Sequence, residues 1–361
     1  MENEIKYFTC GPTELYPDTE KWLKEALNKK LFSLTHRGAE FEKIFQHSVH
    51  EQKKLMNIPE THAIFFMSGA TECMERVIEN LVENKSAHFV NGAFAERFHK
   101  TALDLKKSPY LYSAEWGNGN DLTADLPSDA EMICITQNET STGTATPMED
   151  IYSLKTRYSE KIFILDIVTS APNVDIDFSK IDGAFFSVQK GFGMPAGLGV
   201  MIINKKCIEK TLFMMEMNYN VGSYNNFVSA YNYYLLDQTT VTPNTVGIYL
   251  IGKVCEYLNK YGIEKIRRET KEKADLYYNE LEGVKGLEFF VSDKKHRSET
   301  IIVLNTGSHQ KEIKKRLKHA GFMVSSGYGK LKDTQIRIAN FPMHKMEDCR
   351  KIVEVLKSPL P

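Results

Sequence analysis

The chain has 361 residues, which is too long for one hydrophobic core, so two domains are expected. Apolar residues make up 42% and charged residues 26%, the composition of a globular protein with an ordinary polar surface. The formal net charge is -1 and no basic stripe is present, which argues against nucleic acid or an anionic membrane surface as a partner.

Six cysteines are scattered without a Cys-x-x-Cys pair: Cys10, Cys73, Cys134, Cys207, Cys255 and Cys349. Disulfide frameworks belong to small secreted chains, so free thiols are expected. Residues 1–7 are polar and charged, unlike a signal peptide, and no apolar run is long enough for a membrane span. We therefore expect a cytoplasmic protein, and no metal site.

Short apolar runs alternate with helical patterns between Thr61 and Asn204. Strands are expected over residues 62–67, 87–90, 132–136, 161–165, 184–188 and 198–203, with helices after the first two. This alternation predicts an α/β fold with a largely parallel sheet covered on both faces. In such sheets the active site lies at the carboxyl ends of the strands.

The pattern changes after Pro243. One long helix is expected over residues 248–281, because the stretch is charge-rich and has helical periodicity. Strands are expected over 287–291, 300–304 and 336–340, and helices over 312–319 and 346–356. These elements predict a smaller α+β domain, with its boundary inside or beside the long helix.

Polar residues follow four of the expected strands: Ser68 to Thr71, then Asn138, Glu139 and Thr140, then Asp166, and finally Gln189 and Lys190. Pyridoxal phosphate (PLP) requires a lysine for a Schiff base and a carboxylate on its ring nitrogen, which Lys190 and Asp166 could supply. A helix N-terminus entered through Gly69 and Ala70 could bind the phosphate. Phe94 could stack on the ring.

Each of these residues alone has a simpler explanation, such as a surface lysine, a helix cap or a core phenylalanine. The prediction of a PLP site depends on their order and spacing together.

The combined pattern resembles the class V, fold-type I aminotransferases, most closely the phosphoserine aminotransferases. The resemblance covers nearly the whole chain. It is carried by Phe8-Thr9-Cys10-Gly11-Pro12, Thr35-His36-Arg37-Gly38-Ala39-Glu40-Phe41, Asn138-Glu139-Thr140, Gln189-Lys190 followed by Gly193 to Leu198, and Arg337 in Ile336 to Phe341. The Gln-Lys and His-Arg elements are the most specific.

The resemblance implies a fold-type I PLP-transferase. Its large domain has a mostly parallel, seven-stranded type of sheet, and its smaller domain is α+β. We assign residues 16–245 to the large, PLP-binding domain, and residues 1–15 plus 246–361 to the small, substrate-binding domain.

By the same resemblance, Lys190 and Asp166 are the catalytic pair. Lys190 would form the Schiff base and shuttle the proton, and Asp166 would bind the ring nitrogen. The implied cofactor-binding residues are Gly69, Ala70, Thr71, Phe94, Thr140, Asp166, Gln189, Lys190 and Thr242. Thr242 would reach the phosphate in the partner subunit, so a homodimer with shared active sites is expected.

The implied substrate contacts are of two kinds. Arg337 would grip the α-carboxylate bidentately, a geometry that arginine offers and lysine does not. His36 and Arg37 would meet the distal anion of the substrate.

Three departures from the family pattern stand out. Phe94 occupies a position where the family usually carries Trp, and Val241 replaces the Asn of an Asn-Thr-Pro element. The segment 327–333 lacks the family's His-Arg pair before Arg337. Lys330 or Lys332 could replace its charges, or both could be solvated loop residues, and the sequence leaves both interpretations open.

These features predict a PLP-dependent aminotransferase of serine biosynthesis that pairs phosphoserine and 3-phosphohydroxypyruvate with glutamate and 2-oxoglutarate. The alternative within the fold is an alanine–glyoxylate or serine–pyruvate aminotransferase, which the missing His-Arg pair favours. A cysteine desulfurase needs a reactive thiol on a late, mobile loop, and Cys349 lies in a helical pattern instead.

Two alternatives come from other classes. A non-catalytic PLP-binding module would not need the lysine, aspartate and arginine that are all present. A nucleotide-binding protein would need a Gly-x-Gly-x-x-Gly loop after its first strand, which the chain lacks.

Overall fold

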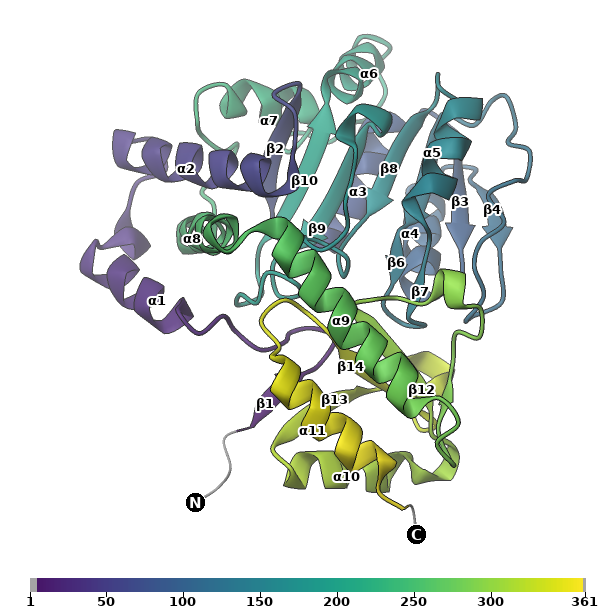
Figure 1. The fold of residues 1–361 in the computed structure, drawn as a ribbon. Helices are drawn as coiled ribbons and strands as arrows, with labels where there is room; N and C mark the ends of the chain where they lie inside the picture. The colour runs from purple at the N-terminus through teal and green to yellow at the C-terminus, as the bar shows by residue number, and fades with distance from the viewer. Residues whose placement is uncertain (1–4, 360–361) are drawn as a thin grey trace.

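The computed structural model describes residues 5–359, which form a large seven-stranded sheet, a smaller five-stranded sheet and the helices packed on them (Figure 1). The strands are β1 (Lys6–Phe8), β2 (His62–Met67), β3 (Ser86–Val90), β4 (Tyr110–Ser113), β5 (Met132–Thr136), β6 (Asn138–Glu139), β7 (Thr144–Ala145), β8 (Ile162–Asp166), β9 (Gly183–Ser187), β10 (Gly199–Asn204), β11 (Glu288–Phe289), β12 (Ile301–Asn305), β13 (Phe322–Ser326) and β14 (Gln335–Ala339).

The α-helices are α1 (Thr19–Asn28), α2 (Ala39–Met56), α3 (Ala70–Leu81), α4 (Ala93–Asp104), α5 (Met148–Arg157), α6 (Lys205–Glu216), α7 (Phe227–Tyr234), α8 (Thr245–Tyr261), α9 (Ile263–Leu281), α10 (Gln310–His319) and α11 (Met346–Lys357). None of these described helices is both long and apolar enough to cross a membrane.

The large sheet has the order β2-β10-β9-β8-β5-β3-β4. Only β10 runs antiparallel to its neighbours, so the prediction of a mostly parallel sheet is confirmed. Because β2, β5, β8 and β9 point the same way, the residues that follow them meet at one edge, as the sequence predicted.

Helices cover both faces of this sheet, and its strands are apolar on both sides. In β2, for example, Ala63 and Phe65 pack in the cluster with α3, α4, α6 and α7. Ile64 packs in the opposite cluster, with α2, α5 and α8. Alternate residues of β2 therefore pack against the helix layers on opposite faces of the sheet.

The long helix expected over 248–281 was wrong. Gly262, at φ +97, separates α8 from α9. Helix α8 packs on α2 and shares the core of the large sheet, whereas α9 packs on α11. The periodicity continued across the break because both helices are amphipathic, and it could not reveal the change of direction.

The smaller sheet has the order β1-β13-β14-β12-β11 and carries α9, α10 and α11. The sequence analysis missed the edge strand β1 and the strand β13, and it made β11 too long. The N-terminal strand β1 pairs parallel to β13, so the chain begins in the small sheet before it enters the large one. The exact residues that divide the two domains stay a prediction.

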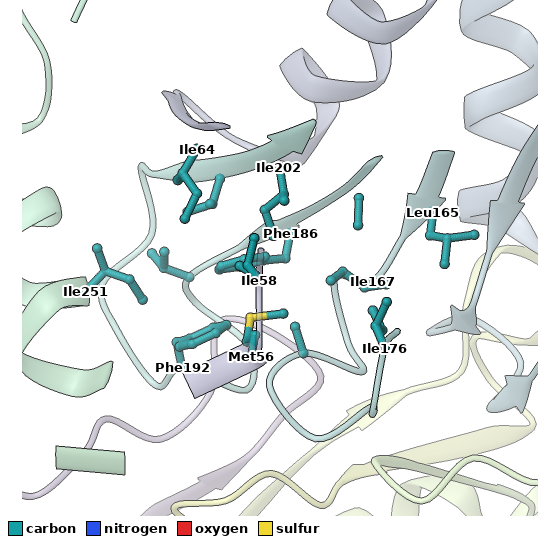
Figure 2. Packing of buried hydrophobic residues seen from close by; sticks show 14 of the residues in the cluster. Met56, Ile58, Ile64, Leu165, Ile167, Ile176, Phe186, Phe192, Ile202 and Ile251 are labelled. Carbon is teal, nitrogen blue, oxygen red and sulfur yellow. The ribbon is translucent and has the colours of Figure 1, made fainter. Parts of the chain in front are cut away.

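The core anchors the loop that carries Lys190. Two residues later, Phe192 is fully buried and its ring stacks on Phe186 of β9, with centroids 4.6 Å apart. Figure 2 shows these two rings among Met56, Ile58 and other apolar side chains. Packing on this scale holds the loop in one position, which is what a catalytic side chain requires.

Candidate active site

A cavity of about 190 Å³ lies at the carboxyl edge of the large sheet. Its lining residues are Gly69, Ala70, Thr71, Met74, Phe94, Arg97, Asn138, Thr140, Asp166, Val168, Ser187, Gln189 and Lys190. All the predicted cofactor-binding residues except Thr242 are among them. The geometry therefore brings together side chains from five separate stretches of the sequence.

Lys190 is almost enclosed by the N-terminal segment. Its Nζ donates a hydrogen bond of 2.6 Å to the carbonyl oxygen of Cys10. Burial is the main cause that lowers the pKa of Lys190 to about 8; the nearby charges of Arg337 and Arg97 contribute to this decrease, and Cys10 and Asp166 oppose it. An appreciable fraction of this amine is therefore neutral near pH 8, as a nucleophile or base must be.

Gly11 makes this enclosure possible. A Cβ atom built on Gly11 would lie 2.2 Å from Cδ of Lys190, and the backbone there has φ +121. Both facts exclude a larger residue at this position without displacement. The close approach of the N-terminal segment to Lys190 thus explains why a glycine occupies position 11.

Asp166 ends β8 and is buried, with 2% of its surface exposed. One carboxylate oxygen accepts a hydrogen bond of 2.9 Å from the Val168 N–H. Burial is the main cause that raises the pKa of Asp166 to about 7; the charge of Glu139 contributes to this increase, and the Val168 hydrogen bond, Lys190 and Arg97 oppose it. Lys190 and Arg97 offset the effect of burial only in part, and a cationic group bound beside the carboxylate would further stabilise its ionised form.

Glu139 fixes the start of α4 and with it Phe94. Its buried carboxylate accepts hydrogen bonds from the backbone N–H groups of Phe94 and Ala95, at 3.0 and 2.9 Å, and from Ser141. Burial raises the pKa of Glu139, and these hydrogen bonds oppose that increase. In the sequence, Glu139 was noted only as part of the Asn-Glu-Thr motif. Nothing near it in the sequence indicated that its carboxylate binds the N-terminus of α4.

The N-terminus of α3 closes the other end of the cavity. The Ala70 N–H donates to Oγ of Ser187 at 2.8 Å, and Oε1 of Gln189 is buried without a hydrogen-bond partner among residues 5–359. Ser187 was missed, because the serine that ends a strand has no distinctive pattern. Helix N-termini bind phosphate groups well, and the unpartnered Oε1 of Gln189 can accept a hydrogen bond from a donor on a ligand.

These observations test the expected cofactor against the site. PLP has a phosphate, a ring nitrogen and an aldehyde, and the cavity presents a helix N-terminus, a buried carboxylate and a lysine. The residues present fit the group. Among residues 5–359, no cluster of three or more His, Cys, Asp or Glu side chains suits a metal ion.

Arg337 lies at the border of the cavity. Its Nε donates to the Ser326 carbonyl at 2.9 Å and its Nη1 to the Thr140 carbonyl at 3.0 Å. Thr140 lines the cavity, and Arg337 is only 9% exposed. The guanidinium is therefore held in one orientation beside the space where an amino acid would bind.

His36, Arg37 and Thr242 do not line this cavity in their own chain. The Arg37 guanidinium donates to Oε1 of Gln238 and to the carbonyls of Thr239 and Thr240, at 3.0, 2.7 and 3.3 Å. The His36 ring contacts Phe41 edge-on, and burial lowers the pKa of this imidazole. Their predicted roles require a second subunit and stay predictions.

Lys330 and Lys332 also lie outside the cavity lining. The Lys330 Nζ is 5.7 Å from the centre of a Trp116 ring, and the Lys332 carbonyl accepts a hydrogen bond from Gln310. A larger cavity, of about 950 Å³, shares Asn138 with the site but contains neither Lys190 nor Asp166.

A family model for class V aminotransferases matches residues 11–332. The chain belongs to the class V aminotransferases. A solved phosphoserine aminotransferase from Cytophaga hutchinsonii is 41% identical, with a TM-score of 0.97 over 100% of both chains.

Among curated proteins, the phosphoserine aminotransferase of Rhodococcus opacus is 24% identical over 96% of this chain and 93% of its own length. An alanine–glyoxylate aminotransferase structure from Nostoc is 20% identical, with a TM-score of 0.83 over 99% of this chain and 95% of that one, and shows the fold alone.

This class V aminotransferase is a PLP-dependent transaminase of fold type I, as the sequence predicted. The alternatives of a nucleotide-binding protein and of a non-catalytic module lose their basis. Cys349, the thiol that a desulfurase would need, is buried in α11.

Proposed function

We propose that this aminotransferase converts phosphoserine and 2-oxoglutarate to 3-phosphohydroxypyruvate and glutamate, and the reverse, in serine biosynthesis. The observation that carries the proposal is the 41% identity to a phosphoserine aminotransferase over the full length of both chains. The cationic surroundings of the cavity, with Arg337 and Arg97 near Lys190, support substrates that carry two anionic groups.

We further propose the roles of the residues that line the cavity. Lys190 would bind the cofactor covalently, Asp166 would bind its ring nitrogen, and Phe94 would lie against its ring. Gly69, Ala70, Thr71 and Gln189 would bind the phosphate, with Thr140 beside the ring. Ser187 joins this set, because it orients the N-terminus of α3 through Ala70.

When bound, PLP withdraws electrons from the substrate and thereby acidifies its α-carbon. The chain's own residues would do the rest. Lys190, whose pKa is lowered to about 8, would take the α-proton on Nζ and return a proton to the product. Asp166 would keep its negative charge once it faces a cation, and Arg337 would hold the α-carboxylate through the Nη N–H groups that its hydrogen bonds to Ser326 and Thr140 leave available.

A homodimer and a cytoplasmic location are also part of the proposal. His36, Arg37 and Thr242 lie outside the cavity of their own chain, which supports a role in the cavity of a second copy. All six cysteines are buried, unpaired thiols, as is usual in a reducing compartment.

The second candidate is an alanine–glyoxylate or serine–pyruvate aminotransferase. One observation favours it: no histidine or arginine precedes Arg337 in the segment 327–333, where Tyr328 contacts the Arg337 guanidinium instead. A small uncharged substrate would need no cation there.

Half-transamination of the purified holoenzyme distinguishes the two candidates. Phosphoserine, glutamate, alanine and serine are added one at a time, and the visible absorbance of the cofactor is followed. We expect conversion with phosphoserine and glutamate but not with alanine. Conversion with alanine or serine, and none with phosphoserine, would establish the second candidate. The control is Lys190→Ala, which should show no conversion with any of the four amino acids.

A further inference from the structure

The site contains an arginine that the sequence analysis did not single out. Arg97 lies one turn after Phe94 on α4 and lines the cavity. Its charge acts on both Lys190 and Asp166, where it lowers the pKa of each. Arg97 therefore lines the same cavity as Lys190 and Asp166, where a bound substrate would meet all three.

The Arg97 guanidinium has few partners. It lies over the Phe94 ring, 5.3 Å from its centre, and donates one long hydrogen bond of 3.3 Å to Oη of Tyr328. Among the described residues, no carboxylate forms an ion pair with it. A guanidinium has five N–H donors, so most of those on Arg97 remain for a ligand.

Arg37, the predicted distal cation, is different. Its guanidinium already donates to three acceptors of its own chain and lies over the Tyr233 ring at 4.4 Å. A cation with filled hydrogen bonds gains less from a new anion than one with free donors. Within one subunit, Arg97 is thus the better placed arginine.

Tyr328 connects Arg97 to Arg337. The Arg337 guanidinium lies 5.4 Å from the centre of the Tyr328 ring, while Arg97 contacts the hydroxyl of the same side chain. Two guanidinium groups therefore contact one tyrosine, Arg337 over its ring and Arg97 at its hydroxyl. Two cations that share one neighbouring side chain favour a substrate with two anionic groups over a substrate with one.

We propose that Arg97 binds the side-chain anion of the substrate, a carboxylate or a phosphate, from within the same subunit, while Arg337 binds the α-carboxylate. This assignment rests on the proposed function, and it supplies the positive charge that the missing His-Arg pair would have provided. Arg97 is then a specificity-determining residue, and Tyr328 positions it.

Binding of unreactive anions tests the proposal without turnover. Glutarate and butyrate differ in one terminal carboxylate, and their affinities for the holoenzyme are measured by calorimetry. Arg97→Ala should weaken glutarate binding about 10- to 100-fold, the usual effect of losing a charged hydrogen bond, and leave butyrate unchanged. Arg97→Lys should restore part of the loss, because it keeps the charge but not the fork.

The matched control is Lys100→Ala, one turn further along α4, which removes an exposed cation that pairs with Asp104. This variant should bind glutarate as the wild type does. Equal losses of glutarate and butyrate in Arg97→Ala, or no loss of either, would overturn the proposal. So would a reduced affinity for PLP alone, since Arg97 would then only support Phe94.

Kinetics keep this proposal separate from the proposed function. In Arg97→Ala, kcat/KM for glutamate and phosphoserine should fall about 10- to 100-fold, whereas Lys100→Ala should leave both values unchanged. A wild type that uses none of these amino acids would refute the proposed function, whereas the glutarate measurement would still decide the role of Arg97. If only phosphoserine depends on Arg97, the side-chain anion is the phosphate.

Discussion

Burial is the main cause of the shifted pKa values of Asp166 and Lys190 at the sheet edge. Asp166 and Lys190 lie in the same cavity, yet burial favours the neutral form of each. A cofactor with a cationic ring nitrogen would stabilise the ionised form of Asp166, which burial alone disfavours. This expectation can be tested on the cofactor-free protein.

The first prediction concerns Asp166. Its folded pKa of about 7 exceeds its ordinary value of 3.8, so the folded protein holds an extra proton between these values. Stability of the cofactor-free protein must therefore fall as the pH rises through this window. Asp166→Asn removes the effect and should stabilise this form by about 2–3 kcal/mol more at pH 8 than at pH 5.

Urea unfolding of both proteins at the two pH values measures this difference. Exposed Asp175, changed to Asn, serves as the control and should show no such pH dependence. The stabilised Asp166→Asn protein should have lost its transaminase activity. An equal effect of the substitution at both pH values would mean that Asp166 is ionised throughout.

At the scale of elements, the site depends on helix ends and on one crossing segment. Glu139 joins the β6 turn to the N-terminus of α4, and Gly11 lets the N-terminal segment pass over Lys190. Neither contact involves residues that are neighbours in the sequence. Both should be sensitive to small substitutions.

We predict that Glu139→Ala destabilises the protein by about 3 kcal/mol or more, because buried backbone N–H groups of α4 lose their acceptor. Glu139→Gln keeps one acceptor and should lose less. Urea unfolding gives the free energies, and PLP titration should show weaker binding as Phe94 moves. Equal stability of the alanine variant and the wild type would contradict this account.

Gly11→Ala should displace Lys190 and reduce turnover at least about tenfold, since misplacement of a catalytic group by about 1 Å can cost more than that. Gly283→Ala is the matched control. It also has a positive φ, of +76, but nothing lies within 4 Å of the added methyl group. Both variants carry the backbone cost, and only Gly11→Ala should lose covalent attachment of PLP, measured by mass spectrometry after reduction.

On the whole molecule, several large apolar side chains are exposed, and four of the most exposed lie near α1 and α7. Leu27, Phe32, Leu235 and Leu236 are between 59% and 61% exposed. They belong to the region of α1, α2 and α7, on the left of Figure 1, where Arg37 contacts Thr239. Large exposed apolar patches are usual at subunit interfaces, which supports a second copy of the chain as the partner.

We predict that the double substitution Leu235→Glu, Leu236→Glu yields a monomer with at least about tenfold weaker PLP binding, because buried charge disrupts the interface and withdraws Thr242 from the partner's cavity. Light scattering and PLP titration measure the two effects. Leu111→Glu, on the edge strand β4 at the other end of the sheet and 53% exposed, should change neither. A fully loaded monomer would refute shared active sites.

Six of the seven strands of the large sheet and the chemistry at its edge could be predicted from the sequence, although β4 was missed. Apolar strand patterns depend on local periodicity, and parallel strands bring the residues that follow them to one edge, so Lys190, Asp166, Gly69 and Gln189 could be brought together from sequence alone. Their pKa directions follow from the burial that such an edge imposes.

The tertiary structure alone decided the contacts between distant segments. Gly11 against Lys190, Glu139 on α4, and Arg97 with Tyr328 and Arg337 join parts of the chain that no periodicity relates. The break at Gly262 was hidden for the same reason, since a helical pattern records which face is apolar but not where the next helix points. Periodicity is a local property, whereas these positions depend on how the two sheets pack.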